Sequence, residues 1–353
     1  MSTTSPPERA PVGPVPEDGV VEARAPAAAA RPDWRALVRP EALFVPATIL
    51  ALGAALSIMT DTFLRQGNLV NVATQMAVLA VVSFGVTIVM IGGAFDLSVG
   101  SQVALHGSVA ALTMQATGSV ALGVLAGLAS GAAFGAVNGL LVTGLRINPF
   151  IVTLGTLVTG RGVALAITGA RPVTGLPPAL RGFGLDNPLG LPWIVWLMLG
   201  CFAVATYLMH ATPFGLQVFA TGGNREAARL SGIRVDRVTV ATFVLSGVFA
   251  ASAGIAITAR LRSGQPTVGV LLELFAVAAV VLGGSSLYGG RGAVWRTLFG
   301  VVLIAIIQNG LNLLNVSAPY QQVAIGAVFI VAASSEFVRR FERGRRRPST
   351  RRS

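Results

Sequence analysis

Long apolar stretches recur along this chain, and they limit its fold more than any other feature of the sequence. A helix needs about 20 predominantly apolar residues to cross the hydrocarbon core of a bilayer. Stretches of roughly this kind occupy ten ranges: 43–59, 69–91, 97–116, 119–145, 149–168, 192–209, 238–259, 270–283, 294–314 and 318–333. Because lipid offers the backbone no hydrogen-bonding partners, such stretches cross a membrane as helices. The sequence therefore predicts an all-α polytopic membrane protein with about ten transmembrane helices.

The composition agrees with a membrane protein and excludes several kinds of chemistry. Hydrophobic residues make up 53% of the chain and charged residues 11%, which is more apolar surface than one soluble core can bury. The sequence contains no Lys, so it lacks the lysine with which a P-loop holds the phosphates of ATP. One Cys and two His cannot build a structural zinc site or a disulfide. We expect no enzymatic activity, no ATPase site and no cofactor bound by this chain.

Both ends of the chain are polar and carry many Arg residues. Residues 1–41 predict a disordered cytoplasmic tail and residues 336–353 a basic cytoplasmic tail, on either side of a transmembrane domain at 42–335. Arg beside apolar spans marks the cytoplasmic side, so both termini are expected in the cytoplasm and the number of spans should be even. The net charge of +12 then indicates contact with a lipid bilayer and not with nucleic acid. The Pro-rich segment 169–191 is expected to form a stiff extracytoplasmic loop.

A polar island interrupts the apolar pattern from Ala211 to Val238. Within it, Asn224 can cap a short helix, Glu226 suits the positive end of the helix dipole, and Gly232 can end the helix in a left-handed conformation. Charge runs are usually solvated connecting loops. A connector between spans needs no helix that is stopped at both ends, and the sequence therefore favours a rigid helix outside the bilayer.

Two apolar stretches contain breaks with polar residues. In the first, paired Gly residues precede Asp96, which is expected to act as the N-cap of a new helix. In the second, Gln265 and Glu273 lie close to the start of an apolar run. Asp96 either caps a helix at the cytoplasmic surface or lies on a solute path, since broken backbone at membrane depth is buried in protein or lines a cavity. Counting spans places the two breaks on opposite sides of the membrane, as inverted repeats would.

Other polar residues within the apolar stretches need partners. Asn138 lies in a Gly-rich run, and small residues there allow close packing of helices. Asn309 and Asn312 are three residues apart and share a helix face, where they serve either helix packing or a solute path. Arg161 lies near the outer end of its span and is expected to snorkel towards the membrane surface.

Five segments resemble, in order, the permease subunits of bacterial ATP-binding-cassette importers for monosaccharides of the ribose, xylose and arabinose type. The segments are GGAFDLSVGS, NPFIVTLGTLVTGRG, TPFGLQVFATGGNREAARLSGI, ELFAVAAVVLGGSSLYGGRG and NGLNLLNVSAPYQQVAIG. The resemblance covers residues 70–335. The chain departs from the family pattern in one extra residue between Gly93 and Asp96, and in Phe275 where the family has Asp.

The resemblance implies a transport subunit in the bacterial cytoplasmic (inner) membrane. Its partners would be a cytoplasmic ATPase subunit, which uses the ATP, an extracytoplasmic sugar-binding protein, and a second permease copy, with a homodimer expected. The island at 211–238 would be the coupling loop, whose contacts to the ATPase come from Asn224, Arg225, Glu226, Ala227, Arg229, Leu230 and Gly232. The polar groups at membrane depth are the candidates for the translocation path: Asp96, Ser98, Asn138, Gln265, Glu273, Asn309 and Asn312.

Two other functions are the alternatives to a permease subunit when the residues are considered alone. A stand-alone secondary transporter coupled to ions would need titratable groups within the membrane, and Asp96 and Glu273 are the candidates. A membrane-embedded enzyme would need clustered His, Cys and carboxylate side chains, and we rank it last because the sequence offers no such set.

Overall fold

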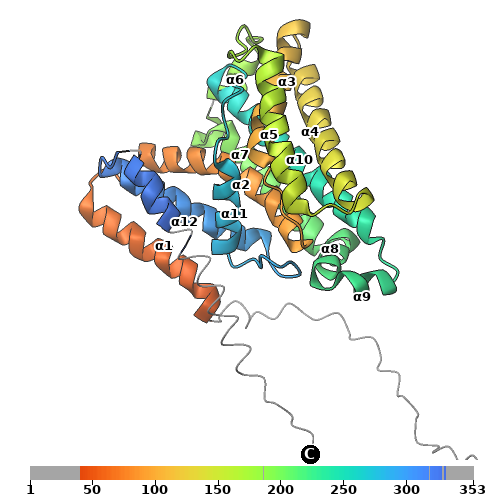
Figure 1. Ribbon diagram of the computed structural model, residues 1–353. Coiled ribbons are helices and arrows are strands. Elements are labelled where there is room, and N and C mark those ends of the chain that lie inside the picture. Colours follow the sequence, from red (N-terminus) through yellow and green to blue (C-terminus); the bar gives the residue numbers. More distant parts are fainter. Residues whose placement is uncertain (1–39, 186, 318, 328–329, 331–353) are drawn as a thin grey trace, which may run out of the picture.

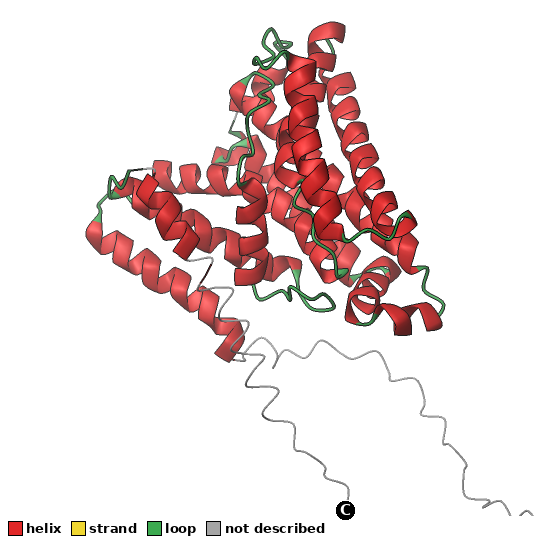
Figure 2. Cartoon of the chain, viewed as in Figure 1, coloured by secondary structure: helices red, strands yellow, loops and turns green. Residues whose placement is uncertain are grey.

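A computed structural model describes residues 40–185, 187–317, 319–327 and 330 of the chain. Across these residues the regular structure is helical and no strand is formed, as Figure 2 shows. The elements are α1 (Pro40–Met59), α2 (Gln66–Ile91), α3 (Val99–Thr117), α4 (Val120–Gly144), α5 (Pro149–Thr168), α6 (Leu180–Leu185), the 3-10 helix η2 (Pro188–Gly190), α7 (Trp193–His210), α8 (Pro213–Gly223), α9 (Arg225–Leu230), α10 (Val235–Leu261), α11 (Leu272–Leu282) and α12 (Val294–Leu313). The predicted all-α class is confirmed.

Six of these helices are long and apolar enough to cross a membrane: α2, α4, α5, α7, α10 and α12. The apolar parts of α1 and α11 are shorter, and α3 carries polar residues such as Gln102 and His106 along its length. The last predicted stretch, 318–333, lies partly outside the described residues, as do the tail at 336–353 and all but the last two residues of the tail at 1–41. The count of about ten spans is therefore not confirmed.

The centre of the bundle is α2, whose residues from Leu79 to Ile91 are all buried. α7, α10, α11 and α12 pack around it, and α3 packs on the other side of α10, against α4 and α5 as well. α4 packs along α10 with very little space between the two backbones: a Cβ atom added to Gly131 would lie 2.5 Å from the carbonyl oxygen of Gly247. The small residues thus permit close helix contact, as the sequence predicts for helices in lipid.

The molecule has two distinct ends, which α10 connects (Figure 1). α8 and α9 lie where α10 begins. With a rise of about 1.5 Å per residue, the 27 residues of α10 span about 40 Å. Beyond its far end, Val173 and Gly264 exchange two backbone hydrogen bonds of 2.9 Å, and they tie the segment at 169–191 to the bundle. This segment, predicted as a loop, contains α6 and η2.

Candidate functional site

The polar island contains a short helix with a defined start and stop. The side chain of Asn224 accepts a hydrogen bond of 3.0 Å from the backbone N–H of Ala227 at the start of α9. At its end, the N–H groups of Gly232 and Ile233 donate to the carbonyl oxygens of Arg229 and Ala228, and Gly232 has a φ of 83°. This is the pattern of a Schellman motif. The predicted cap and the predicted left-handed stop are both confirmed.

α9 presents a mixed polar and apolar surface to the outside of the bundle. Leu230 is 82% exposed, and the Glu226 side chain is 72% exposed. Arg229 lies 3.8 Å from the Glu226 carboxylate. Ala227 is also exposed, whereas Ala228 is buried beneath the helix. The exposed face of α9 therefore places one large apolar side chain beside ionic groups.

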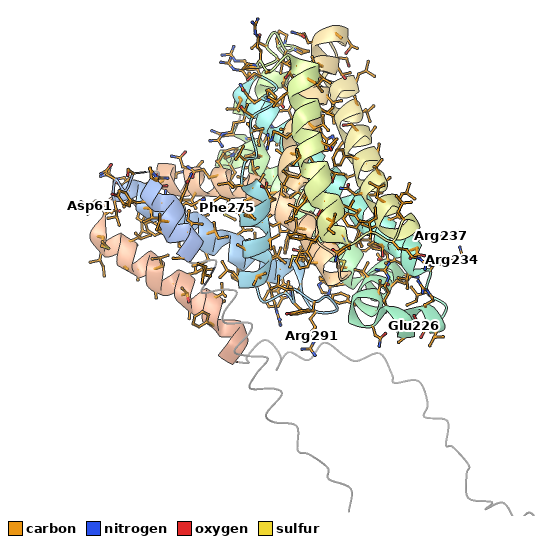
Figure 3. All side chains as sticks on the ribbon, viewed as in Figure 1. Asp61, Glu226, Arg234, Arg237, Phe275 and Arg291 are labelled. Carbon is orange, nitrogen blue, oxygen red and sulfur yellow. The ribbon has the colours of Figure 1, made fainter. Side chains whose placement is uncertain are left out.

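Asp236, in the first turn of α10, holds α9 against the bundle. Its carboxylate lies 3.4 Å from Arg225 and 4.0 Å from Arg229, and Arg225 also donates to the hydroxyl of Thr239 at 3.2 Å. Figure 3 shows Glu226, Arg234 and Arg237 at this corner of the molecule. The ion pairs are exposed and each contributes little alone, but together with the caps they fix the direction of a helix of only six residues.

The sequence prediction missed α8, which lies between α7 and α9. Its start is marked by Thr212 and Pro213, an N-cap residue followed by proline at the first helical position. This signal was available in the sequence. α8 leads directly into Asn224, which ends α8 and begins α9, so a single residue joins the two helices.

The end of α8 lies in what we call the glycine junction, formed by Gly93, Gly222, Gly289 and Gly290. Gly290 donates its backbone N–H to the carbonyl oxygen of Ile91, the last residue of α2, at 2.8 Å. A Cβ atom on Gly222 would collide with that same carbonyl oxygen and lie 2.7 Å from the Gly290 nitrogen. A Cβ atom on Gly289 would lie 2.7 Å from Cα of Gly93. Three chain segments thus meet backbone to backbone, with no room for side chains.

A buried group of polar side chains, the polar core, follows the junction at the break between α2 and α3. The Asp96 carboxylate accepts from the hydroxyl of Ser246 at 2.7 Å, from the hydroxyl and the backbone N–H of Ser98 at 2.5 and 3.1 Å, and from Gln102 at 3.4 Å. The Ser98 oxygen in turn accepts from Gln102 and Asn138 at 2.8 and 2.9 Å. All five residues are at most 1% exposed.

This geometry revises two expectations about Asp96. The N-cap position of α3 is Ser98, two residues further on, but the Ser98 side chain makes no capping bond there, and the Asp96 carboxylate accepts the backbone N–H of Ser98 instead. The alternative of a cap at the cytoplasmic surface is wrong, because Asp96 contacts Ser246, which lies about 16 Å along α10 from its first residue. The physical reason is that Ser98, Gln102 and Ser246 supply donors inside the bundle, so the carboxylate is stabilised there and not at the surface.

Arg161 holds the second break in place. Its guanidinium donates to the carbonyl oxygens of Pro266 and Val268 at 3.0 and 2.6 Å and approaches that of Gly100 at 3.5 Å. The expected snorkelling of Arg161 is therefore wrong, because carbonyl groups that the break leaves free satisfy its donors within the protein.

The two breaks start at different ends of α10 and converge. The first follows Gly93 at the glycine junction, and the second follows the end of α10 and contains Gln265, which is partly buried and donates to Ser263. They meet where a Cβ atom on Gly100 would lie 2.5 Å from the carbonyl oxygen of Gly269. The polar core and the Arg161 contacts therefore lie on either side of one point inside the bundle.

The structure separates the two asparagines of α12. Asn309 is 5% exposed and forms a reciprocal pair of hydrogen bonds with Asn68 of α2, at 2.8 and 3.0 Å. Asn312 is exposed and accepts from Gln321 at 2.8 Å. The sequence left helix packing and a solute path open for Asn309, and its hydrogen bonds to Asn68 assign it to helix packing.

The chain matches the family described as "Branched-chain amino acid transport system / permease component" over residues 68–333. It is 42% identical over 288 residues to the ribose import permease protein RbsC of Escherichia coli strain K12, a match that covers 80% of this chain and 90% of that protein. The identity is 43% to RbsC of Bacillus subtilis, over 78% of this chain and 86% of the relative. It is 36% to the L-arabinose transport system permease protein AraH of E. coli K12, over 79% and 85%. No solved structure matches the chain.

Proposed function

Because this chain belongs to the permeases of ATP-binding-cassette importers for monosaccharides, we propose that it forms the membrane path through which a monosaccharide or related polyol enters the cell. A separate cytoplasmic ATPase subunit supplies the energy, and an extracytoplasmic binding protein delivers the solute. The chain is a multi-pass protein of the inner membrane. In the proposal both termini and α9 lie on the cytoplasmic side.

The kind of solute follows from the relatives and not from the family description. That description names branched-chain amino acids, whereas the relatives at 36–43% identity are named for ribose and L-arabinose. Pentoses are therefore the first solutes to test, and polyols of similar size are the second.

The observation that carries the proposal is the exposed helix α9. A helix that is capped at both ends and tied to α10 by Asp236 moves as a rigid unit. Leu230 provides an apolar anchor for a groove on the ATPase, and Glu226 and Arg229 provide polar contacts around it. Such an element can convert closure of the ATPase subunits into a push on the permease.

The glycine junction gives this push a route to the membrane interior. Movement of α9 shifts the end of α8, and Gly222 contacts the carbonyl oxygen of Ile91 without any flexible side chain between them. The break that holds Asp96 begins two residues later, at Gly93. Because packed backbones cannot be compressed, displacement of α8 moves the break between α2 and α3.

In the proposal the path forms where the two breaks converge and against a second permease copy. Gln265 and Glu273, both partly exposed, face this path together with the exposed Asn312. Asp96, Ser98, Asn138 and Asn309 are buried within the protomer, and they shape the path by fixing the helices around it.

The proposal is tested with purified complex in proteoliposomes supplied with ATP, binding protein and labelled ribose or arabinose. Leu230→Asp and Glu226→Arg should leave the permease folded but separate ATP hydrolysis from uptake. Leu189→Asp is the matched control, because Leu189 is 89% exposed and belongs to the segment tied to the other end of α10. Normal uptake in both α9 variants would refute the proposal.

The alternative of an ion-coupled transporter working alone makes a different prediction for the same carboxylates. If Asp96 or Glu273 carried a coupling ion, the amide variants Asp96→Asn and Glu273→Gln would abolish uptake driven by a proton or sodium gradient. If ATP-dependent uptake persists in both variants and does not respond to such gradients, the result supports the ATP-driven importer.

A further inference from the structure

An apolar groove with a positively charged mouth lies on the outside of the bundle, beside α9. Its volume is about 700 Å³, within the range of roughly 300–1,000 Å³ that is typical of ligand pockets. Leu140 of α4, Leu208 of α7 and Phe214 of α8 form its walls, together with Val240 and Val244 of α10. Arg237, in the first turn of α10, lies at its mouth.

The charge of Arg237 is not compensated within the described part of the chain. Its neighbour Asp236 also lines the groove, but that carboxylate pairs with Arg225 and Arg229. Arg237 forms no ion pair with any described residue and is exposed. Figure 3 shows it next to Arg234 and apart from Arg291, which lies elsewhere on the same end of the molecule. The mouth of the groove therefore offers a cation to an external anion.

The apolar walls and the cationic mouth together define the ligand. We propose that the groove binds an anionic phospholipid, with an acyl chain lying along α10 between α4 on one side and α7 and α8 on the other, and with the phosphate group on Arg237. Basic pockets between transmembrane helices are known to hold anionic headgroups, and a guanidinium can donate two parallel hydrogen bonds to a phosphate. The acyl chain contributes little to the affinity, because it moves from the apolar bilayer into an equally apolar groove. Selection therefore depends on the charge of the headgroup.

A second copy of this chain is a poorer occupant than a lipid. In a two-fold symmetric contact the same surface patch lies on both copies, so a second copy would bring a second Arg237, likewise without an ion pair among the described residues, towards this groove. An anionic lipid neutralises Arg237 and also fills the apolar walls. The assignment to the cytoplasmic leaflet rests on the proposed function, whereas lipid binding itself does not.

The test measures lipid binding to the purified, delipidated full-length chain by native mass spectrometry. The chain is titrated with dioleoylphosphatidylglycerol, which is anionic, and with dioleoylphosphatidylcholine, which is zwitterionic. The wild-type chain should bind the anionic lipid about fivefold more tightly, the ratio expected for one basic residue near the membrane surface. Arg237→Gln should remove this preference, and the control Arg291→Gln should keep it.

A second variant tests the apolar part of the groove. Ala241 lines the groove, and Ala241→Phe should reduce binding of both lipids while the unfolding temperature stays within a few degrees of wild type. An unchanged fivefold preference in Arg237→Gln would overturn the proposal. Undiminished binding in Ala241→Phe, or a cross-link between Leu140→Cys residues of two copies, would also overturn it. Co-purification of the ATPase, which depends on Leu230, reports separately on the proposed function.

Discussion

Gly222→Ala adds one methyl group at the point where α8 meets the end of α2. The added Cβ would collide with the carbonyl oxygen of Ile91, and its next contact is the Gly290 nitrogen at 2.7 Å. Both contacts are backbone atoms, so no side chain can rotate away. The neighbouring Gly223 also lies in α8, but a Cβ atom there would meet nothing within 4 Å. The two glycines therefore form a matched pair for the same substitution.

The two substitutions should change the free energy of unfolding in opposite directions. Overpacking of a filled site costs about 1–3 kcal/mol, so Gly222→Ala should lower the free energy of unfolding by that amount. Gly223→Ala loses no contact and restricts the unfolded chain, and it should be neutral or stabilising by up to ~1 kcal/mol. With a shift of roughly 2–4 °C per kcal/mol for domains of 150–250 residues, the two melting temperatures should differ by several degrees.

The assay combines thermal unfolding in detergent with ATP-driven uptake in proteoliposomes. Gly222→Ala should retain its ATPase partner, because α9 itself is unchanged. Its uptake rate should nevertheless fall by more than the loss of folded protein explains. Gly223→Ala should transport normally. Equal melting temperatures and equal uptake rates for the two variants would refute the role of the glycine junction.

Three further predictions concern polar contacts inside the bundle. Asp96→Ala leaves several buried donors without an acceptor, at about 1–3 kcal/mol for each unsatisfied group, and the melting temperature should fall well below that of Asp96→Asn; equal values would contradict the polar core. A double-mutant cycle of Asn68→Ala and Asn309→Ala should give a coupling energy of about 0.6–1.7 kcal/mol in thermal unfolding, and additive effects would show that the two amides do not interact. Arg161→Gln removes the donors to two carbonyl oxygens and should speed hydrogen–deuterium exchange across residues 262–271, while an unchanged exchange rate would mean that Arg161 does not hold this segment.

Local rules predicted the features of the chain that depend on neighbouring residues. The cap at Asn224 and the stop at Gly232 were both predicted, because each depends on residue type at a fixed position in a short helix. The apolar stretches at 149–168 and 294–314 agree with α5 and α12 to within one residue, whereas α10 begins three residues before the stretch predicted at 238–259.

Contacts between distant segments were not predictable from one sequence. Ser246, the partner of Asp96, is 150 residues away, and nothing near either residue indicates the pair. Asn309 could be assigned to helix packing only once Asn68 was found opposite it. The glycine junction brings together residues 93, 222, 289 and 290, and a glycine in a sequence does not reveal which backbone requires the space. The start of α8 is different, because Thr212 and Pro213 mark it locally in the sequence.

Docking of the ATPase on α9 is the central claim, and co-purification tests it most directly. The tagged chain is solubilised from its native membrane, and the proteins that remain bound are identified by mass spectrometry. The account predicts that an ATPase subunit binds to the wild-type chain and to Leu189→Asp, and that it is lost from Leu230→Asp. An ATPase subunit that stays bound to Leu230→Asp, or a chain that transports solute alone without ATP, would contradict the account.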